Sequence, residues 1–187
     1  MATKPKLIKV CLTNLGEDTE TPWAYDLGDV RGGKKVKLAN VPFMHAKPTW
    51  GDTIVVKYVD GMWTWDRDGV PWSKVGTRIA EDGEHWAMIV DYDPHPGEDD
   101  AFGALAKACR DGDVVCEGAW GPEGAKPGRV YLAVPDEMSD VQVMAKLRAR
   151  ELPCELVQVH PAPPVKKKKV VAAKKRPKKP VAKKKRR

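Results

Sequence analysis

Short runs of apolar and β-branched residues recur through the first 82 residues, some alternating with polar residues at the period of two that half-buried strands show. Strands are predicted at 7–12, 23–25, 35–38, 52–59, 62–65 and 72–79. Asp60-Gly61 separates two of these runs, and this dipeptide favours a type I′ hairpin because both central residues need a positive φ. Short strands with frequent turns predict a small β-barrel or curled sheet in residues 1–82.

From residue 83 onward, helical periodicity appears between the apolar runs. Strands are predicted at 85–92, 114–119, 129–134 and 156–159. A helix is predicted over 98–110, where acids precede an apolar face and Gly112 stands at the C-terminal end. Ser139-x-x-Gln142 is a capping box that predicts the start of a second helix. The inward positions predicted for that helix are Val141, Met144, Ala145 and Leu147.

The order of these elements, β-α-β-β-α-β, is that of a ferredoxin-like domain. The sequence therefore predicts an α+β fold class, with a barrel-like region at 1–82 and a ferredoxin-like region at 83–160. Residues 161–187 form a third region that combines prolines with a dense run of cations. This region has no aromatic residue and no apolar periodicity, so we expect a disordered polycationic tail.

The tail also divides the charge of the chain. Its Lys and Arg side chains sum to +14 without any acid, so residues 1–160 carry −7 of the formal net charge of +7. The basic residues are Lys166, Lys167, Lys168, Lys169, Lys174, Lys175, Arg176, Lys178, Lys179, Lys183, Lys184, Lys185, Arg186 and Arg187. Cations at this density favour binding to nucleic acid phosphates with release of counterions.

The composition of the tail limits what such binding can recognise. It contains no Asn, Gln or aromatic residue that reads bases, so we expect sequence-independent association with DNA or RNA. Its Lys, Ala and Pro usage is similar to that of linker-histone tails. No aromatic residue is present to insert into a lipid surface, and no membrane partner is predicted.

The body, residues 1–160, should repel DNA because of its net negative charge. We therefore expect it to contact a different partner, such as another protein. An alternative is a protein-interaction or immunity-type protein, in which this acidic body binds a basic partner and the tail is secondary.

Two groups of residues in the body are candidates for binding or chemistry. Trp63 and Trp65 share one face of their strand, and an exposed pair could stack on bases, whereas a buried pair would fill the barrel core. Asp91, Asp93 and His95 end a predicted strand and offer a second alternative, a metal-dependent enzyme. The leading prediction is a non-enzymatic protein with no catalytic residue, cofactor or metal.

The four cysteines lack Cys-x-x-Cys spacing and are expected to be small buried side chains in a reducing compartment. Neither a signal peptide nor an apolar run of about 20 residues is present. These features predict a cytoplasmic protein, for which association with the nucleoid is an option.

Four short segments form a recognisable pattern in the first 60 residues: Glu20-Thr21-Pro22-Trp23-Ala24, Leu27-Gly28, Leu38-x-Asn40-x-Pro42-Phe43 and Gly51-Asp52. In these segments the chain resembles an uncharacterised bacterial family, domain-of-unknown-function family 4265. Members of that family often have a Gly-His-Ser-Thr segment, where this chain has Val75-Gly76-Thr77-Arg78 without the His and Ser. The resemblance implies no activity, and Asn40–Phe43 and Gly51-Asp52 are explained by turns and an apolar anchor.

Overall fold

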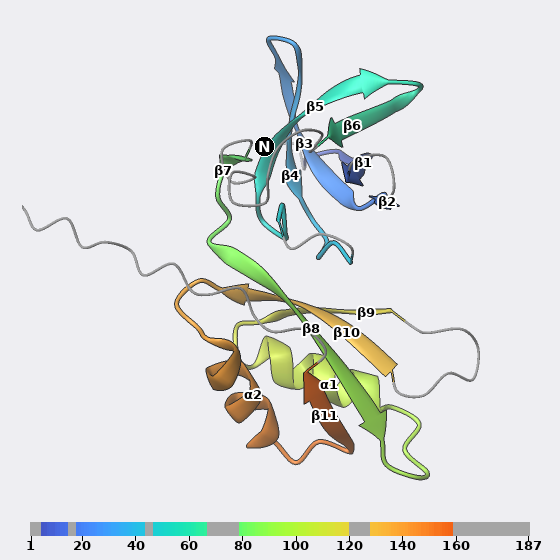
Figure 1. The fold of residues 1–187 in the computed structure, drawn as a ribbon, viewed down its shortest axis with the longest axis vertical. Coiled ribbons are helices and arrows are strands. Elements are labelled where there is room, and N and C mark those ends of the chain that lie inside the picture. Colours follow the sequence, from blue (N-terminus) through green and yellow to red (C-terminus); the bar gives the residue numbers. More distant parts are fainter. Residues whose placement is uncertain (1–4, 15–17, 44–46, 67–78, 120–127, 159–187) are drawn as a thin grey trace, which may run out of the picture.

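The computed structural model describes residues 5–14, 18–43, 47–66, 79–119 and 128–158. These residues form a barrel and a second sheet with two helices, which lie one above the other in Figure 1. The predicted disordered tail at 161–187 and most of the strand predicted at 72–79 lie outside the described residues.

The first part of the chain folds into a closed barrel. Its strands are β1 (Leu7–Asn14), β2 (Asp18–Glu20), β3 (Trp23–Val30), β4 (Gly33–Leu38), β5 (Thr53–Val59), β6 (Met62–Asp66) and β7 (Ile79–Glu81). The order β1-β3-β4-β5-β6 is antiparallel between neighbours, and β6 then pairs in parallel with β1 to close the ring. β2 and β7 add to β1 and β5 outside this ring. Closure removes the exposed edges that an open five-stranded sheet would leave.

The barrel interior is filled by alternate residues of its strands. The buried core consists of Val10, Leu12, Ala24, Val36, Leu38, Ile54, Val56 and Trp65. Trp65 is the largest of these side chains and is only 2% exposed. One large ring therefore occupies volume that the small aliphatic residues around it cannot fill.

The hairpin predicted at Asp60-Gly61 is confirmed. Asp60 has a φ of 48° and Gly61 a φ of 83°. Val59 faces Met62 across the turn, which leaves a two-residue loop between β5 and β6. The turn needs positive φ at both positions, and this dipeptide supplies it.

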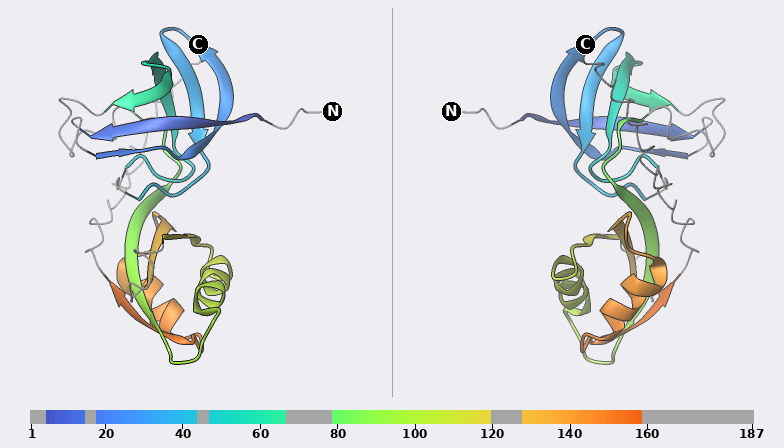
Figure 2. Two further views of the ribbon diagram at one scale, coloured as in Figure 1. Left: turned by 90° about the vertical axis from the view of Figure 1, so that its right-hand side faces the viewer. Right: turned by 90° about the vertical axis from the view of Figure 1, so that its left-hand side faces the viewer.

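The second part is a four-stranded antiparallel sheet with both helices on one face (Figures 1 and 2). Its elements are β8 (His85–Pro94), α1 (Ala101–Arg110), β9 (Val115–Ala119), β10 (Gly128–Pro135), α2 (Asp140–Arg148) and β11 (Cys154–Gln158). The strand order is β11-β8-β10-β9. Buried residues of β8 and β10 pack with the helices in a second core that includes Leu105, Leu132 and Leu147.

The capping box predicted for the second helix is confirmed. The Ser139 hydroxyl accepts from the Gln142 N–H at 3.2 Å, and the Gln142 side chain accepts from the Ser139 N–H at 2.8 Å. The buried face was predicted less well, because Val143, Met144 and Leu147 are inside while Val141 is 71% exposed. Ala145 is exposed as well.

The limits of the first helix differ from the prediction. It begins at Ala101, and the Asp100 carboxylate accepts from the Gly103 N–H at 3.1 Å. Gly112 was predicted at the C-terminal glycine position, but the left-handed residue there is Asp113, with a φ of 61°. Asp tolerates this conformation better than most residues because its side chain can bond locally.

The predicted α+β class with a ferredoxin-like half is wrong, because the described chain is mainly β. Eleven strands and only two helices are found in the described residues. The barrel predicted within residues 1–82 is the part of the fold prediction that the structure confirms. The helices contain 10 and 9 residues. Helical periodicity located both helices, but the fold class was predicted from their presence although both are short. The pairing of β1 with β6 that closes the barrel cannot be recognised from the residue pattern of either strand alone.

Replacement of the central barrel residue, Trp65→Ala, is expected to lower the free energy of unfolding by about 3–5 kcal/mol because it leaves a large cavity. Urea unfolding followed by circular dichroism measures this loss. Tyr58→Ala is the control, since Tyr58 is 63% exposed, and it should cost about 1 kcal/mol or less. Equal losses in the two variants would contradict the assignment of Trp65 to the core.

Candidate functional site

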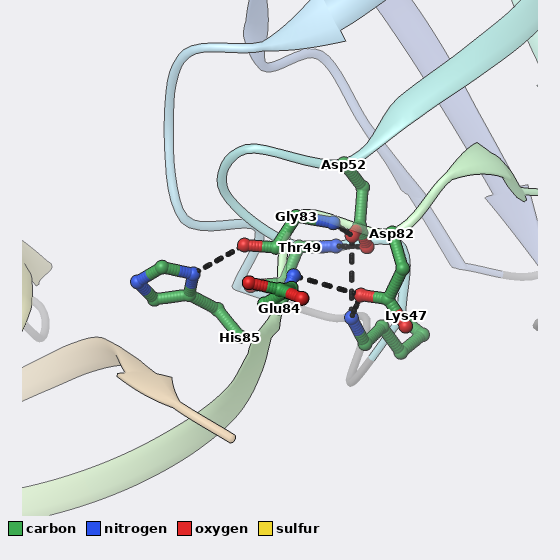
Figure 3. A network of polar contacts seen from close by, with 7 residues as sticks. All are labelled: Lys47, Thr49, Asp52, Asp82, Gly83, Glu84 and His85. Carbon is green, nitrogen blue, oxygen red and sulfur yellow. Dashed lines mark hydrogen bonds and ion pairs between the residues drawn. The ribbon is translucent and has the colours of Figure 1, made fainter. Parts of the chain in front are cut away.

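The barrel and the second sheet meet at a joint built around a buried carboxylate (Figure 3). Asp52, immediately before β5, is 0% exposed. Its Oδ2 accepts from the Thr49 N–H at 2.8 Å, and its Oδ1 accepts from the Gly83 N–H at 2.7 Å. One side chain thus ties the turn before β5 to the segment that leads into β8.

Lys47 supplies the positive charge of the joint. Its Nζ lies 3.2 Å from Asp52 Oδ1 and 2.9 Å from Asp82 Oδ1. Burial raises the pKa of Asp52, although Lys47 and the two N–H donors oppose this effect. Burial also raises the pKa of Asp82, but the donors from Lys47 and the Glu84 N–H outweigh it, so the net direction is down. The ammonium group therefore compensates a buried carboxylate and a more exposed one.

The backbone segments in the joint are in close contact. A Cβ on Gly83 would lie 2.5 Å from the carbonyl carbon of Gly51 and 2.7 Å from the nitrogen of Asp52. The Gly83 carbonyl lies 2.6 Å from Nδ1 of His85, whose ring meets Trp50 edge-on with centroids 4.9 Å apart. Only glycine fits at position 83, and these contacts make the joint a structural connection.

A second contact is made by the segment after β4, which reaches the face of the second sheet opposite the helices. Asn40 Oδ1 accepts from the Trp23 N–H at 2.7 Å, and Asn40 Nδ2 donates to Glu117 Oε2 at 3.1 Å. The ring of Phe43 stacks on Tyr131 with centroids 4.3 Å apart. Asn40 therefore connects a barrel strand to β9 through a single amide.

A cavity of about 320 Å³ opens beside this contact. It is lined by Glu20, Thr21, Pro22, Trp23, Asn40, Val41, Phe43 and Glu117. Burial raises the pKa of Glu117, against the effect of hydrogen bonds from Asn40 and the Val41 N–H. The cavity offers one carboxyl group with a raised pKa beside aromatic walls.

The two tryptophans predicted as a possible stacking pair are both used within the barrel. Trp65 is buried in the core. Trp63 is partly buried against the same core. The centroid of its ring lies 5.2 Å from that of Tyr58 and 5.3 Å from the Nζ of Lys34. Core filling therefore describes Trp65, whereas Trp63 is half-buried at the edge of the same core.

Asp91, Asp93 and His95 are not brought together. The Asp91 carboxylate is bound by Arg129, with Nε–Oδ1 at 2.8 Å and Nη2–Oδ2 at 3.3 Å. Asp93 and His95 are exposed. Among the residues that the structure describes, no group of three or more His, Cys, Asp or Glu side chains could hold a metal ion. The alternative of a metal-dependent enzyme at these residues has no site to support it.

The cysteines are free thiols. Cys11, Cys109 and Cys154 are buried, and Cys116 is partly buried. A hydrogen bond with Cys116 and burial raise the pKa of Cys109, while burial raises the pKa of Cys11 and Cys154. A raised pKa disfavours the reactive thiolate, so these three residues act as packing side chains.

The acidic surplus of the body is confined to its second region. Residues 1–82 contain 12 Lys and Arg against 11 Asp and Glu, a net charge of +1. Residues 83–160 contain 7 Lys and Arg against 15 Asp and Glu, a net charge of −8. The body is therefore a nearly neutral barrel joined to an acidic second region, a division that a count over the whole body hides.

Comparisons with known proteins give little further information. No protein-family model matches the sequence, and no functionally curated protein matches it. A solved structure described as a hypothetical protein from Neisseria gonorrhoeae is similar with a TM-score of 0.43 and 9% sequence identity, over 84% of this chain and 96% of that one. Neither helix among the described residues is long and apolar enough to cross a membrane.

The close approach at the joint predicts a strong effect of Gly83→Ala. The added methyl would overlap backbone atoms of residues 51 and 52, so the free energy of unfolding should fall by about 1–3 kcal/mol or more. Gly112→Ala is the matched control, because a Cβ there meets its neighbours at 3.4 Å. Urea unfolding of both variants measures the difference, and a neutral Gly83→Ala would argue against the tight joint.

The raised pKa of Glu117 predicts a pH dependence of stability. The folded state binds the carboxyl proton more tightly than the unfolded chain, so the free energy of unfolding should fall as pH rises through the folded pKa. Glu117→Gln cannot ionise and should lack this decrease. Unfolding measured between about pH 4 and pH 7 tests it. Glu155→Gln, at an exposed position on β11, controls for the loss of one charge, and equal pH slopes in all three proteins would refute the assignment.

Proposed function

We propose that this chain is a non-enzymatic protein that associates with nucleic acid through residues 161–187. One observation carries the proposal: these 27 residues hold 14 Lys and Arg and no acid. The mechanism is neutralisation of phosphates with release of counterions, which needs no base contact. DNA and RNA are both ligands for such binding. A cytoplasmic protein associated with the nucleoid fits this mechanism.

The distribution of charge in the body supports separate roles for the tail, which binds nucleic acid, and for the acidic second region. The second region, at −8, is repelled by a polyanion, whereas the barrel, at +1, is not. Nucleic acid held by the tail is therefore expected to lie nearer the barrel. The acidic region stays free for a partner of a different kind.

A second candidate function is protein interaction through that acidic region. The confinement of the acidic surplus to residues 83–160 favours it, because a concentrated charge attracts a basic partner more strongly than the same charge spread over the whole body. A protein complex that survives removal of the tail would support this candidate.

Deletion of residues 161–187 is expected to abolish retention of duplex DNA on a gel. In the full chain, the logarithm of the binding constant should fall steeply with the logarithm of salt concentration, with a slope of up to about −12 if every cation engages a phosphate. Fluorescence anisotropy with a labelled duplex measures the slope. Replacement of the 14 basic residues by Gln, at constant length, is the control and should behave like the deletion. Unchanged duplex binding by the deleted chain would refute the proposed function.

A further inference from the structure

The outer surface of the barrel carries aromatic and basic side chains that neither the core nor the joint uses. Because side chains alternate along a strand, the neighbours of the core residues Ala24, Val36 and Leu38 point outward. The outward residues of three adjacent strands form a patch that we call the outer basic face. It consists of Leu7 and Lys9 on β1, Trp23 and Tyr25 on β3, and Lys35 and Lys37 on β4.

Strand register places these aromatic and basic residues side by side. Lys9 is the cross-strand partner of Trp23, and Tyr25 is the partner of Leu7 on one side and of Lys37 on the other. The Nζ of Lys9 lies 5.2 Å from the centroid of the Trp23 ring. Each ring thus has a lysine side chain on a neighbouring strand.

Both rings are accessible from solvent. Trp23 is 44% exposed and Tyr25 is 38% exposed. Residues two apart on a strand are separated by about 6.6 Å, which leaves space for a separate planar ring against each. Two accessible aromatic rings in a row, with cations beside them, form the platform that proteins use to stack the bases of a single strand.

Charge also indicates the direction in which a bound strand would run. Lys9 and Lys37 form no salt bridge among the described residues, whereas Lys35 is paired with Glu81 on β7, and the same Glu81 also interacts with Lys37 at longer range. At the other end, Trp23 borders the cavity that contains Glu20 and Glu117, whose carboxylates repel phosphate. A polyanion on this face would therefore extend from Trp23 over Tyr25 towards Lys37, away from the cavity that contains Glu20 and Glu117.

We propose that the outer basic face binds single-stranded nucleic acid, with Trp23 and Tyr25 stacking on bases and Lys9 and Lys37 contacting phosphates. This inference deepens the proposed function and rests on it only in taking nucleic acid as the ligand. The tail supplies attraction to any polyanion. The face adds preference for single strands, because the bases of a duplex are stacked on each other and present no free surface to an aromatic ring.

The test compares the full chain with Trp23→Ala/Tyr25→Ala on three fluorescein-labelled probes: oligo(dT) and oligo(U) of about 16 nucleotides, and a duplex of the same length. Loss of stacking should weaken binding to single strands by about fivefold to 150-fold for each base affected and leave duplex binding unchanged. The two oligonucleotides show whether DNA or RNA is preferred. Tyr58→Ala removes an exposed aromatic residue outside the face and should change neither affinity.

Two further variants separate stacking from folding and from charge. Trp23→Leu/Tyr25→Leu keeps apolar side chains but removes the rings, so it should lose single-strand affinity, whereas Trp23→Phe/Tyr25→Phe should retain most of it. Lys9→Gln/Lys37→Gln should reduce the salt slope for oligo(dT) by about 1.4, at roughly 0.7 for each phosphate that is no longer neutralised. Lys107→Gln, on α1 and paired with Asp111, is the matched control and should not change the slope.

The proposal is overturned if the ring variants bind single strands as the wild type does, or if they lose single-strand and duplex affinity equally. Its failure can be told apart from failure of the proposed function. Deletion of 161–187 tests the tail through duplex binding, while the ring variants test the face through the ratio of single-strand to duplex affinity. A tail deletion without effect on duplex binding would refute the proposed function of the tail. The single-strand site on the outer basic face would still be decided by the affinity ratio.

Discussion

The arrangement of this molecule depends on one buried carboxylate. Asp52 accepts hydrogen bonds from Thr49 and Gly83 and faces the ammonium group of Lys47, so the entry to β5 and the entry to β8 are held by the same side chain. A buried charge is stable only when it is paired and fully hydrogen-bonded, and removal of any one partner leaves the others uncompensated. The orientation of the second sheet relative to the barrel therefore depends on a few atoms, together with the Asn40–Glu117 hydrogen bond.

Three of the four short segments singled out in the sequence, 20–24, 38–43 and 51–52, supply residues to these contacts. Glu20 accepts from the Phe43 N–H, Asn40 bridges Trp23 and Glu117, and Asp52 forms the joint. Each of these polar side chains satisfies a backbone group or links two elements, so their spacing is explained by the fold without any chemistry on a substrate. Trp23 is different: its backbone N–H is held by Asn40, but its ring lies on the outer surface beside Lys9. The residue that orders the chain locally is also the one whose ring is accessible to a ligand.

Features set by adjacent residues could be predicted from the sequence, and features set by distant pairing could not. The Ser139 capping box and the Asp60-Gly61 hairpin depend on residues within one turn, and both were found. The sequence predicted a barrel or a curled sheet without distinguishing them, because closure depends on the parallel register of β1 and β6, about 50 residues apart. The same reason explains the tryptophans: alternation placed Trp63 and Trp65 on one face, but only the closed ring shows that this face is the interior. The sequence feature that indicates the outer basic face is the alternation at Trp23 and Tyr25, which coincides with lysines on both neighbouring strands.

The tail and the outer basic face would act on different properties of a nucleic acid. Attraction by lysines is long-ranged, is screened by salt and treats all phosphates alike, whereas stacking acts only in contact and requires unpaired bases. A chain with the tail alone would bind duplex more tightly than single strand, because the duplex has the higher density of phosphate charge. The aromatic face reverses that order only where bases are exposed. The net charge of −8 on the second region also favours binding to the outer basic face, because it keeps bound phosphates on the barrel side of the joint. Salt should weaken duplex binding more steeply than single-strand binding, because each phosphate contact contributes a slope of about −0.9 on a duplex and about −0.7 on a single strand.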